Sequence, residues 1–293
     1  MDTKALVSII VVNYNSKEDL AELFSSLENC TYQNTEWIVV DNASKDNDFE
    51  ALLEQYPNQL KVIHNPENNG FAAANNLGIE AAKGAYYLFI NPDVVVKPDF
   101  LDHLVAVMQR NEKIGLVSPK IKYYDQPDFI QYAGSTRINP LTMRNYSPGK
   151  NKRDHPLYQI TKSTAYGHGA AMMVSKEVIE QVGPMDERYF LYYEELDWCE
   201  RIRKAGFEIY YVASSLVYHK VSQSVQSNSY TQVFYMNRNR ILFARLNHTV
   251  WQVVVYLFYA IFIQTPIYIY RYINKPILLK AYLNGLRWHL HFV

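Results

Sequence analysis

Polar side chains that could bind a ligand follow four apolar runs in the first third of the chain. These runs end in Asn13-Tyr14-Asn15, Asp41-Asn42, His64-Asn65 and Asn91-Pro92-Asp93. Asn and Asp are common in turns, so one or two such ends would need no further explanation. Four of them predict a ligand site, because ligands of open α/β sheets bind beyond the carboxyl ends of the strands.

A second group with possible chemistry lies in Glu194–Ala205, EELDWCERIRKA. The helix predicted here carries two acid-to-base pairs at i,i+4 spacing, typical of a surface: Asp197 with Arg201 and Glu200 with Lys204. Glu194 and Glu195 lack such a partner, since Trp198 and Cys199 stand four positions on. The field at a helix N-terminus would favour both carboxylates. The pair is also a candidate for acid–base chemistry.

The elements that must position these groups alternate along the chain. Strand-like runs are Val7–Val12, Trp37–Val40, Leu60–Ile63 and Tyr86–Ile90, and Gly70–Lys83 is typical of a helix. Alternation of this kind predicts βαβ units and a parallel sheet.

Residues 119–218 show a less regular pattern. Residues 119–166 hold five prolines and are expected to form a long loop. After them we expect a strand, two helices and two short strands, at Ala170–Val174, Lys176–Val182, Glu194–Ala205, Ile209–Val212 and Leu216–Tyr218.

Composition and missing motifs exclude several classes of protein. With 48% hydrophobic and 20% charged residues the chain is expected to fold. Its two cysteines, Cys30 and Cys199, cannot make a disulfide framework or a four-cysteine zinc site. GxGxxG, GxxxxGK[ST], HExxH, CxxC and GxSxG are all missing, which argues against dehydrogenases, P-loop NTPases, zinc proteases and serine hydrolases. The first residues lack a signal-peptide cleavage site, so a cytoplasmic location is expected.

Six segments occur in a telling order: VSIIVVNYNS, VDNASKD, NNGFAAANNLGI, YLFINPDVVV, GHGAAMMV and FLYYEELDWCERIRKAGF. Together they resemble the family-2 inverting glycosyltransferases, most of all the bacterial rhamnosyltransferase branch. The resemblance covers roughly residues 5–222. It implies the α/β GT-A fold, a Rossmann-like, mixed but mainly parallel sheet flanked by helices. We expect a catalytic domain at 1–225, with a nucleotide-sugar half at about 1–118 and an acceptor half at about 119–225.

The same resemblance implies a reaction. A sugar would pass from dTDP-rhamnose or a UDP-sugar to a hydroxyl of a glycan or a polyprenyl-diphosphate-linked acceptor, in bacterial surface polysaccharide synthesis. Contacts to the nucleotide are then expected from Tyr14, Asn15, Asp41, Gly70, Asn76 and Asn91. A turn or helix cap is the alternative for Asp41, and a turn is the alternative for Asn15. Asn75 replaces an arginine common in the family, which weakens any role for residue 75 at the pyrophosphate.

A metal site is implied at Asn91-Pro92-Asp93, where the family has its DxD motif. Mg²⁺ or Mn²⁺ would neutralise the departing diphosphate, and both ions accept oxygen ligands. Asn91 removes the first carboxylate of the motif, so Asp93 becomes the expected ligand. His219, which follows a strand, is the expected second ligand. Turn chemistry at Asn-Pro-Asp and a structural histidine stay open as alternatives.

The catalytic base is implied at the acidic pair. The family normally has Asp at the second position, where this chain has Glu195; its extra methylene moves the carboxylate by about 1 Å. Glu195 is therefore the expected base and Glu194 its alternate. Contacts to the acceptor or the donor sugar are expected from His168, Gly169 and Trp198.

Charge is distributed unevenly over a chain whose net charge is zero. Glu208 is the last acidic residue, so residues 209–293 carry a charge of +8 and residues 1–208 a charge of −8. The basic part holds 11 of the 25 tyrosines, which fits a membrane interface better than nucleic acid. Docking of this basic part on the acidic domain is the alternative.

Within the basic part, Val250–Ile263 is nearly all apolar. Its 14 residues would span about 21 Å as a helix, short of the roughly 30 Å of a bilayer core. We therefore expect residues 226–293 to be helical and to lie peripherally on the inner face of the cell membrane. A homodimer through these helices would need the same apolar surface.

Two other functions remain possible from the residues. A nucleotidyltransferase would need a glycine-rich phosphate loop after the first strand, where NYNSKEDL offers only Lys17. A non-catalytic nucleotide-sugar-binding or scaffold protein of the same fold would be compatible with Asn91 in place of an aspartate.

Overall fold

The computed structural model describes residues 4–45, 49–56, 60–220 and 229–290. Its strands are β1 Val7–Asn13, β2 Thr35–Asn42, β3 Leu60–Asn65, β4 Tyr86–Ile90, β5 Val94–Val96, β6 Ile114–Tyr123, β7 Phe129–Tyr132, β8 Lys152–Arg153, β9 Lys162–Ser163, β10 Ala171–Ser175 and β11 Glu208–His219. Its α-helices are α1 Lys17–Glu28, α2 Phe49–Leu53, α3 Phe71–Ala81, α4 Phe100–Met108, α5 Lys176–Val182, α6 Glu194–Lys204, α7 Tyr230–Asn247, α8 Val250–Tyr259, α9 Thr265–Tyr272 and α10 Pro276–Arg287.

One mixed sheet organises residues 7–219, in the order β3-β2-β1-β4-β10-β6-β11-β5. The pairs among β1, β2, β3 and β4 are parallel, and β10 runs antiparallel between β4 and β6. The carboxyl ends of β1, β2 and β4 therefore lie at one edge, as the polar residues at these ends predict. The mainly parallel α/β sheet expected from the sequence is confirmed.

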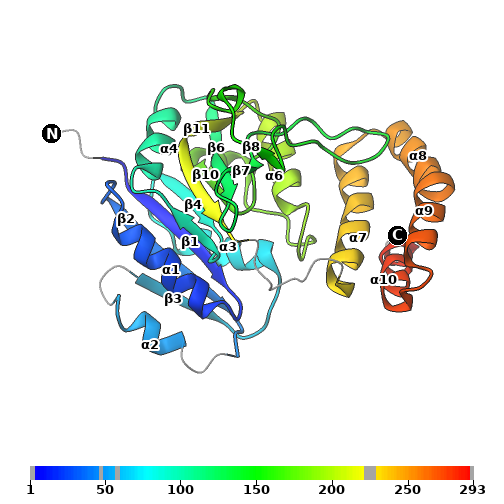
Figure 1. Ribbon diagram of the computed structural model, residues 1–293, viewed down its shortest axis with the longest axis horizontal. Coiled ribbons are helices and arrows are strands. Elements are labelled where there is room, and N and C mark those ends of the chain that lie inside the picture. The colour runs from blue at the N-terminus through cyan, green and yellow to red at the C-terminus, as the bar shows by residue number, and fades with distance from the viewer. Residues whose placement is uncertain (1–3, 46–48, 57–59, 221–228, 291–293) are drawn as a thin grey trace.

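Helices cover both faces of this sheet (Figure 1). Side chains alternate along β1, so that Ile9 and Val11 join the core under α1 and α4, while Ile10 joins the core under α3 and α6. Both faces of the strand are buried, which explains its continuous apolar run. The two cores fix the sheet edge that carries the polar residues.

The region 119–166 is more ordered than its prolines predict. β6 runs through Pro119, and β11 is a single strand with an irregular register between Val212 and Leu216. Pro119 pairs beside this irregularity, and β10 pairs with β6 only at Leu116 and Val117. Proline is tolerated at such a place because one ladder of hydrogen bonds is already interrupted. The expectation of a long irregular loop is wrong at the end of β6 and at β7, β8 and β9, while residues 133–151 hold no strand or helix.

The C-terminal helices α7–α10 stand at one side of the sheet (Figure 1). α7 contacts both α6 and α10, so it lies between the sheet domain and the remaining helices. A separate apolar cluster, which includes Val233, Tyr268 and Tyr282, holds the helices together. The helical C-terminal region expected from the sequence is confirmed for residues 230–290.

α8 and α9 are joined by a π-helical turn, Ala260–Gln264, into one helix over Val250–Tyr272. Proline inside a helix removes a hydrogen bond and crowds the preceding turn. The wider turn before Pro266 gives that room, and Thr265 donates from its backbone N–H to Ala260 O. The helix is thus 23 residues long, not the 14 inferred from the apolar run.

Candidate active site

The ends of β1 and β2 form a hydrogen-bonded polar cluster. Asn13 Nδ2 donates to Asp41 Oδ1 at 3.1 Å and to Ser44 Oγ at 3.0 Å. Asn15 adopts a left-handed conformation with φ of 52° and accepts from the Lys45 backbone N–H at 2.8 Å. Tyr14 is 39% exposed beside it. Three of the residues expected to contact a nucleotide, Tyr14, Asn15 and Asp41, therefore share one edge of the sheet.

Asp93 follows β4 and meets His219 at the end of β11. Asp93 Oδ2 lies 3.1 Å from His219 Nε2, and His219 Nδ1 lies 2.8 Å from Gln131 Oε1. With the amide oxygen of Gln131 as acceptor, Nδ1 carries the proton. Nε2 then faces a carboxylate with its lone pair unless a second proton or a cation lies between them. No motif or spacing indicated Gln131, because its pairing depends on where β7 lies.

The residues around Asp93 fit a divalent cation that is shared with a diphosphate. Asn91 Oδ1 is buried and has no hydrogen-bond partner, although buried amide oxygens normally have one. Over the described ranges, no three His, Cys, Asp or Glu side chains gather as a metal site. Magnesium sites commonly use one or two protein ligands and substrate phosphates. Asp93 and His219 meet that need.

Glu194 and Glu195 open α6, and neither carboxylate is fully paired. Oε2 of each is buried without a hydrogen-bond partner. Burial, and then the Glu195 carboxylate, raise the pKa of Glu194 well above its ordinary value. Burial also raises the pKa of Glu195. Two buried carboxylates with raised pKa values are typical of a functional site.

A loop before β10 joins the acidic pair to the Asp93–His219 pair. A Cβ on Gly169 would lie 3.9 Å from Glu195 Cδ. The His168 ring lies 6.2 Å from the His219 ring, centroid to centroid. Burial lowers the pKa of His168 to about 3, so its ring is neutral. Glu195, Gly169, His168 and His219 thus form a continuous path from base candidate to metal candidate.

Three residues expected in the site have other contacts. A Cβ on Gly70 would lie 2.3 Å from Phe190 O, so its glycine lets a second backbone approach rather than a ligand. Asn76 donates to Met185 O and Glu187 Oε1, both at 2.9 Å. Trp198 has no exposed surface and donates to Gly183 O at 2.9 Å. Gly70 and Asn76 therefore contact residues 185–190 of the protein itself, and Trp198 is a core residue.

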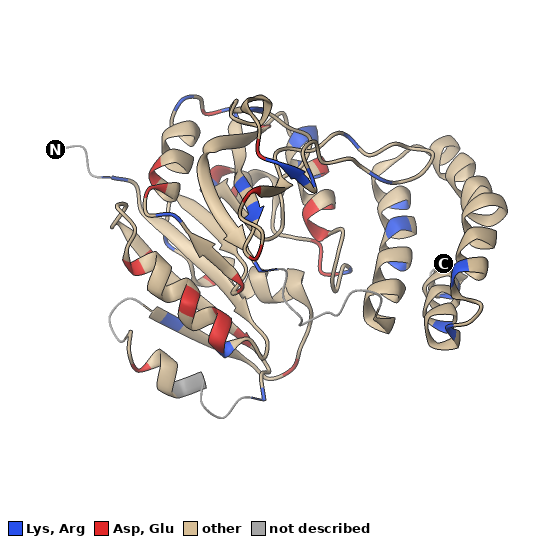
Figure 2. Ribbon diagram, in the orientation of Figure 1, with Lys and Arg blue, Asp and Glu red and all other residues tan. Residues whose placement is uncertain are grey.

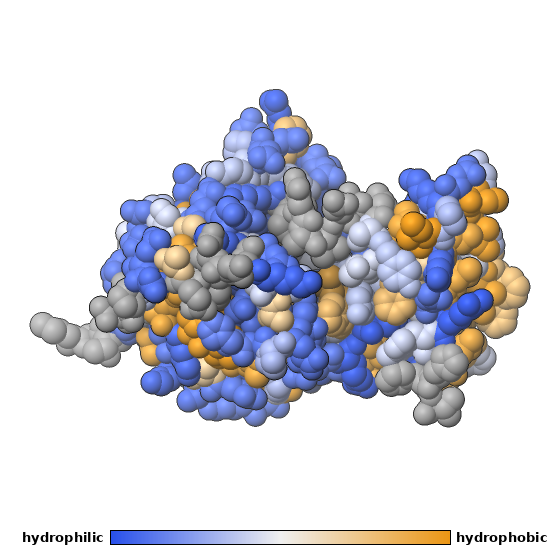
Figure 3. Space-filling view, turned by 90° about the horizontal axis from the view of Figure 1, so that it is seen from below, coloured by the Kyte–Doolittle hydropathy of each residue, from blue (hydrophilic) through white to orange (hydrophobic). Residues whose placement is uncertain are grey.

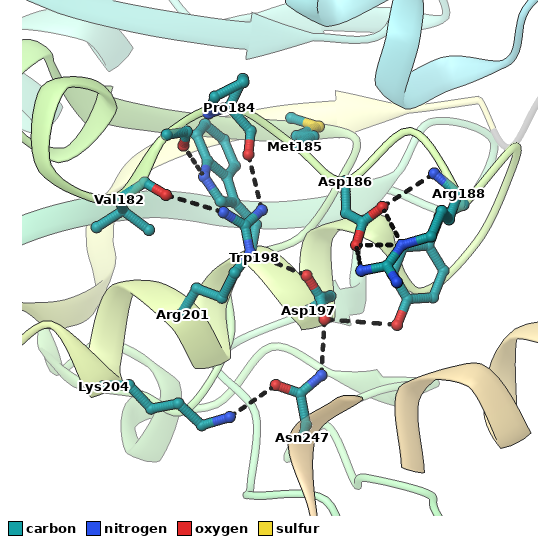
Figure 4. Close-up of polar contacts among 12 residues, drawn as sticks. Val182, Pro184, Met185, Asp186, Arg188, Asp197, Trp198, Arg201, Lys204 and Asn247 are labelled. Atoms are coloured by element: carbon teal, nitrogen blue, oxygen red, sulfur yellow. Dashed lines mark hydrogen bonds and ion pairs between the residues drawn. The ribbon is translucent and has the colours of Figure 1, made fainter. Parts of the chain in front are cut away.

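The ion pairs expected on the surface of α6 are also different. Asp197 does pair with Arg201 at 3.0 Å, but Asp197 is only 2% exposed. Figure 4 shows Arg201 directed at the carbonyls of Val182 and Pro184, and Asn247 of α7 between Asp197 and Lys204. Glu200 pairs instead with Arg203. The helix is therefore held by polar contacts from Asp197 to Lys204, of which those at Lys204 are exposed.

The model of the family described as glycosyl transferase family 2 matches residues 8–183. The chain belongs to this family. It is a glycosyltransferase with the GT-A fold, in agreement with the expectation from the sequence segments.

Two curated relatives match most of this glycosyltransferase. A low-salt glycan biosynthesis hexosyltransferase, Agl10, of Haloferax volcanii is 29% identical over 246 residues, 80% of this chain and 74% of the relative. An N-acetylglucosaminyl-diphospho-decaprenol L-rhamnosyltransferase of Mycobacterium tuberculosis is 25% identical over 266 residues, 84% of this chain and 86% of the relative.

Solved structures support the fold. GalNAc-T7 with UDP, GalNAc and Mn²⁺ matches with a TM-score of 0.66 at 17% identity, over 81% of this chain but only 48% of that one. The mannosyltransferase PcManGT of Pyrobaculum calidifontis, in complex with GDP-Man and Mn²⁺, matches with a TM-score of 0.61 at 14% identity, over 97% and 75% of the two chains.

Proposed function

We propose that this glycosyltransferase moves a sugar from a nucleoside diphosphate to an acceptor hydroxyl with inversion at the anomeric carbon. The observation that carries the proposal is the buried, unpartnered Glu195 Oε2 beside Gly169 and the His168–His219 path. A single displacement needs one base on the acceptor side and a stabilised leaving group on the other side. Glu195 and the Asp93–His219 pair supply these two functions.

Glu195 would accept the proton of the acceptor hydroxyl as the new bond forms. Two adjacent buried carboxylates do not both ionise easily, so in this proposal the pair shares one proton, which Glu194 holds while Glu195 acts as the base. A raised pKa brings the base closer to the working pH, where a general base is most effective.

Asp93 and His219 would hold Mg²⁺ or Mn²⁺ together with the donor diphosphate. Such an ion, when bound, neutralises negative charge on the leaving nucleoside diphosphate. Gln131 keeps the His219 Nδ1 proton away from the ion and so presents Nε2. Asn91 Oδ1 is available to accept a hydrogen bond from a water at the same place.

The nucleoside would lie over the ends of β1 and β2. Tyr14 is exposed enough for its ring to pack on a base, and Asp41 can accept hydrogen bonds from a ribose or base. Asn13 orients the Asp41 carboxylate through its 3.1 Å contact. We expect dTDP-rhamnose or a UDP-sugar as donor, because one relative is named as a rhamnosyltransferase.

The acceptor is proposed to be a polyprenyl-diphosphate-linked sugar or a related glycan in the synthesis of bacterial surface polysaccharide. That same relative is named for an N-acetylglucosaminyl-diphospho-decaprenol substrate, which is a lipid-linked sugar. Such an acceptor requires an enzyme whose site lies near a membrane. Residues 1–225 would act as the catalytic domain and residues 226–293 as the part that meets the bilayer.

The long helix Val250–Tyr272 suits a bilayer surface. By length and composition it could also cross one. One of its faces packs inside the protein, with buried residues at every fourth position: Tyr256, Ala260, Gln264, Tyr268 and Tyr272. The other face is apolar and exposed, and it includes Trp251, Phe258, Phe262 and Ile267. A helix with one face packed on protein and an exposed apolar face on the other side is expected to lie in the plane of the membrane–water interface. We place this helix on the cytoplasmic side of the membrane.

A donor panel tests the proposed function. Purified enzyme is incubated with dTDP-, UDP- and GDP-sugars, with Mn²⁺ or Mg²⁺ and a lipid-linked acceptor, and nucleotide release is measured. At least one donor should turn over with either ion and stop with a chelator. Glu195→Gln should lower kcat by about 10²–10⁴-fold.

The anomeric configuration of the product, read by NMR, tests inversion. Turnover of no donor, or full activity of Glu195→Gln, would overturn the proposal. A protein that only binds its donor would still bind nucleotide as the Glu195→Gln variant. Neither this variant nor the wild type of such a protein would release nucleotide from a donor sugar.

A further inference from the structure

Four consecutive polar residues of α7, Asn237-Arg238-Asn239-Arg240, are all buried. Successive residues of a helix point in directions about 100° apart, so one solvated face cannot hold all four. Buried polar groups need partners inside the protein. The partners therefore show what this part of α7 does.

Asn239 has no exposed surface, and its amide is fully used. Its Nδ2 group donates to Leu191 O at 2.8 Å and to Tyr192 O at 2.7 Å. Its Oδ1 accepts from Arg238 Nε at 2.6 Å. One side chain thus holds the carbonyls of two successive residues, and only Tyr193 stands between them and the acidic pair of α6.

The two arginines hold the same segment at other points. Arg240 Nε donates to the hydroxyl of Tyr193 at 3.0 Å, and this hydroxyl donates to Met143 O at 2.9 Å. Arg238 donates to Arg188 O. We call residues 188–193 the strap. α7 therefore contacts the strap at its beginning, its middle and its end.

The opposite side of the strap is held by the start of α3. Phe71 donates from its backbone N–H to Phe190 O at 2.8 Å, and Gly70 allows the close approach. At the end of the strap Tyr192 and Tyr193 have φ of 70° and 75°. Such left-handed conformations are unfavourable for tyrosine and persist only when the surroundings impose them.

We propose that Asn239 is a positioning residue for the catalytic base: by holding the carbonyls of Leu191 and Tyr192 it sets where α6 begins and so where the Glu195 carboxylate lies. This inference rests on the proposed function of Glu195. A misplacement of a reacting group by about 1 Å can cost about 10²-fold in rate, so a hydrogen bond one turn away can matter to kcat.

Holding α6 against α7 does not by itself require Asn239. Asn247, at the end of α7, donates to Asp197 Oδ1 at 2.6 Å and accepts from Lys204 Nζ at 3.0 Å. Figure 4 shows both contacts on α6 itself, one to Asp197 in its first turn and one to Lys204 at its last residue, and neither is to a residue of the strap. Asn247 is thus a matched control, the same residue type on the same helix with a tie to the same neighbour.

The experiment compares Asn239→Ala with Asn247→Ala at saturating and limiting donor. Asn239→Ala should lower kcat by about 10–100-fold and leave the KM for the donor within about twofold. Asn247→Ala should lower the melting temperature by a similar amount but keep kcat within about threefold. Equal kcat values for the two variants would overturn the inference.

The pH profile separates positioning from mere destabilisation. The groups that face Glu195 are Glu194 on its own helix, Tyr192 of the strap and Cys199. Release of the strap admits water to the carboxylate, which lowers its raised pKa toward the ordinary value. The acid limb of kcat should therefore move to lower pH in Asn239→Ala and stay in place in Asn247→Ala. An unmoved limb in Asn239→Ala contradicts the inference.

Tyr193→Phe decides the matter if Asn239→Ala does not fold. It keeps the ring and removes only the hydroxyl between Arg240 and Met143. We expect the same movement of the acid limb with a several-fold lower kcat, and an unchanged profile would overturn the inference. If Glu195→Gln is itself fully active, the proposed base is wrong; if it is inactive while the strap variants behave as wild type, only the role of Asn239 is wrong.

Discussion

At the scale of single residues, the acidic pair of α6 combines a function with a cost in stability. Two carboxylates with unpartnered buried oxygens would not be chosen for stability alone. Residues that are strained or poorly solvated persist where the site uses them. Glu194 and Glu195 therefore invite a test in which stability and activity change in opposite directions.

Glu194→Gln is expected to stabilise the protein at neutral pH. The folded-state pKa of Glu194 is raised, so the stability associated with its proton is fully present below the unfolded pKa and is lost as the pH rises through the folded pKa. The variant should exceed wild type in melting temperature by about 2 °C or more at pH 8, and the difference should shrink as the pH falls and vanish below the unfolded pKa of about 4.5. A difference that is constant from pH 4 to pH 8 would argue against this explanation.

Gln131 should affect metal affinity without touching the metal. Its Oε1 fixes the proton of His219 on Nδ1. Loss of such an outer partner typically costs about 10–100-fold in metal affinity. Gln131→Leu should therefore need about 10–100-fold more Mn²⁺ for half-maximal activity. It should also lower the melting temperature of the metal-free protein, because the buried Nδ1 of His219 loses its partner. Unchanged metal dependence would remove His219 from the proposed ligands.

At the scale of elements, the strap joins parts of the chain that are far apart in sequence. α3 holds it from one side and α7 from the other. Gly70 is the residue that permits the first of these contacts. The free-energy cost of placing a Cβ against Phe190 can be separated from the cost of the backbone conformation of Gly70.

Gly70→Ala and Gly183→Ala form a matched pair for this purpose. Both glycines have positive φ, 91° and 81°, but a Cβ on Gly183 meets nothing within 4 Å, whereas a Cβ on Gly70 meets Phe190 O at 2.3 Å. Gly183→Ala should cost about 1–3 kcal/mol for its conformation alone, because a positive φ with ψ of 178° is essentially restricted to glycine. Gly70→Ala should cost at least about 1 kcal/mol more because backbone must move. Urea unfolding measures both; equal losses would show that the strap yields freely.

The local hydrophobic pattern predicted the strands and helices well where its period agrees with the burial of their side chains. β4 and α5 have the bounds expected from the sequence, and the alternation around β1–β4 predicted the sheet. β6 was missed because proline is read locally, while its tolerance at Pro119 depends on an irregular partner strand.

Only those site residues that belong to a motif or follow the end of a strand could be predicted from the sequence. Asp93 and His219 do lie together, and so do Gly169 and Glu195. Gly70 was expected at a ligand, since sequence shows that a close approach is needed but not which partner approaches. Arg238 and Arg240 were counted as basic surface, although both are buried. The polar run NRNR between apolar residues was the available signal for the strap contacts.

At the scale of the whole molecule, basic residues and exposed apolar side chains gather at one end, on α7–α10 (Figure 2, Figure 3). Figure 2 shows basic residues but no acidic ones on α7–α10. Arg271, Lys275, Lys280 and Arg287 are exposed there. Figure 3 shows hydrophobic side chains gathered over the same helices. This combination favours an anionic lipid surface.

Phe262→Glu tests that surface directly. Phe262 is 65% exposed on the apolar face of the long helix, and Leu157, 66% exposed on the sheet domain, is its control. Wild type and Leu157→Glu should float with anionic vesicles, less so at high salt, while Phe262→Glu should stay in solution. A wild type that ignores vesicles would refute the membrane proposal; if it then migrates as a dimer that Phe262→Glu dissociates, the face is a subunit interface.

The central claim is that the ends of β1, β4 and β11 bind a nucleoside diphosphate together with a divalent cation. Calorimetric titration of UDP and dTDP, with and without Mn²⁺, tests this claim without any knowledge of the acceptor. At least one nucleotide should bind at least about tenfold more tightly with Mn²⁺, and Asp93→Ala should abolish that gain. Failure of both nucleotides to bind with Mn²⁺, or an undiminished gain in Asp93→Ala, would contradict the claim.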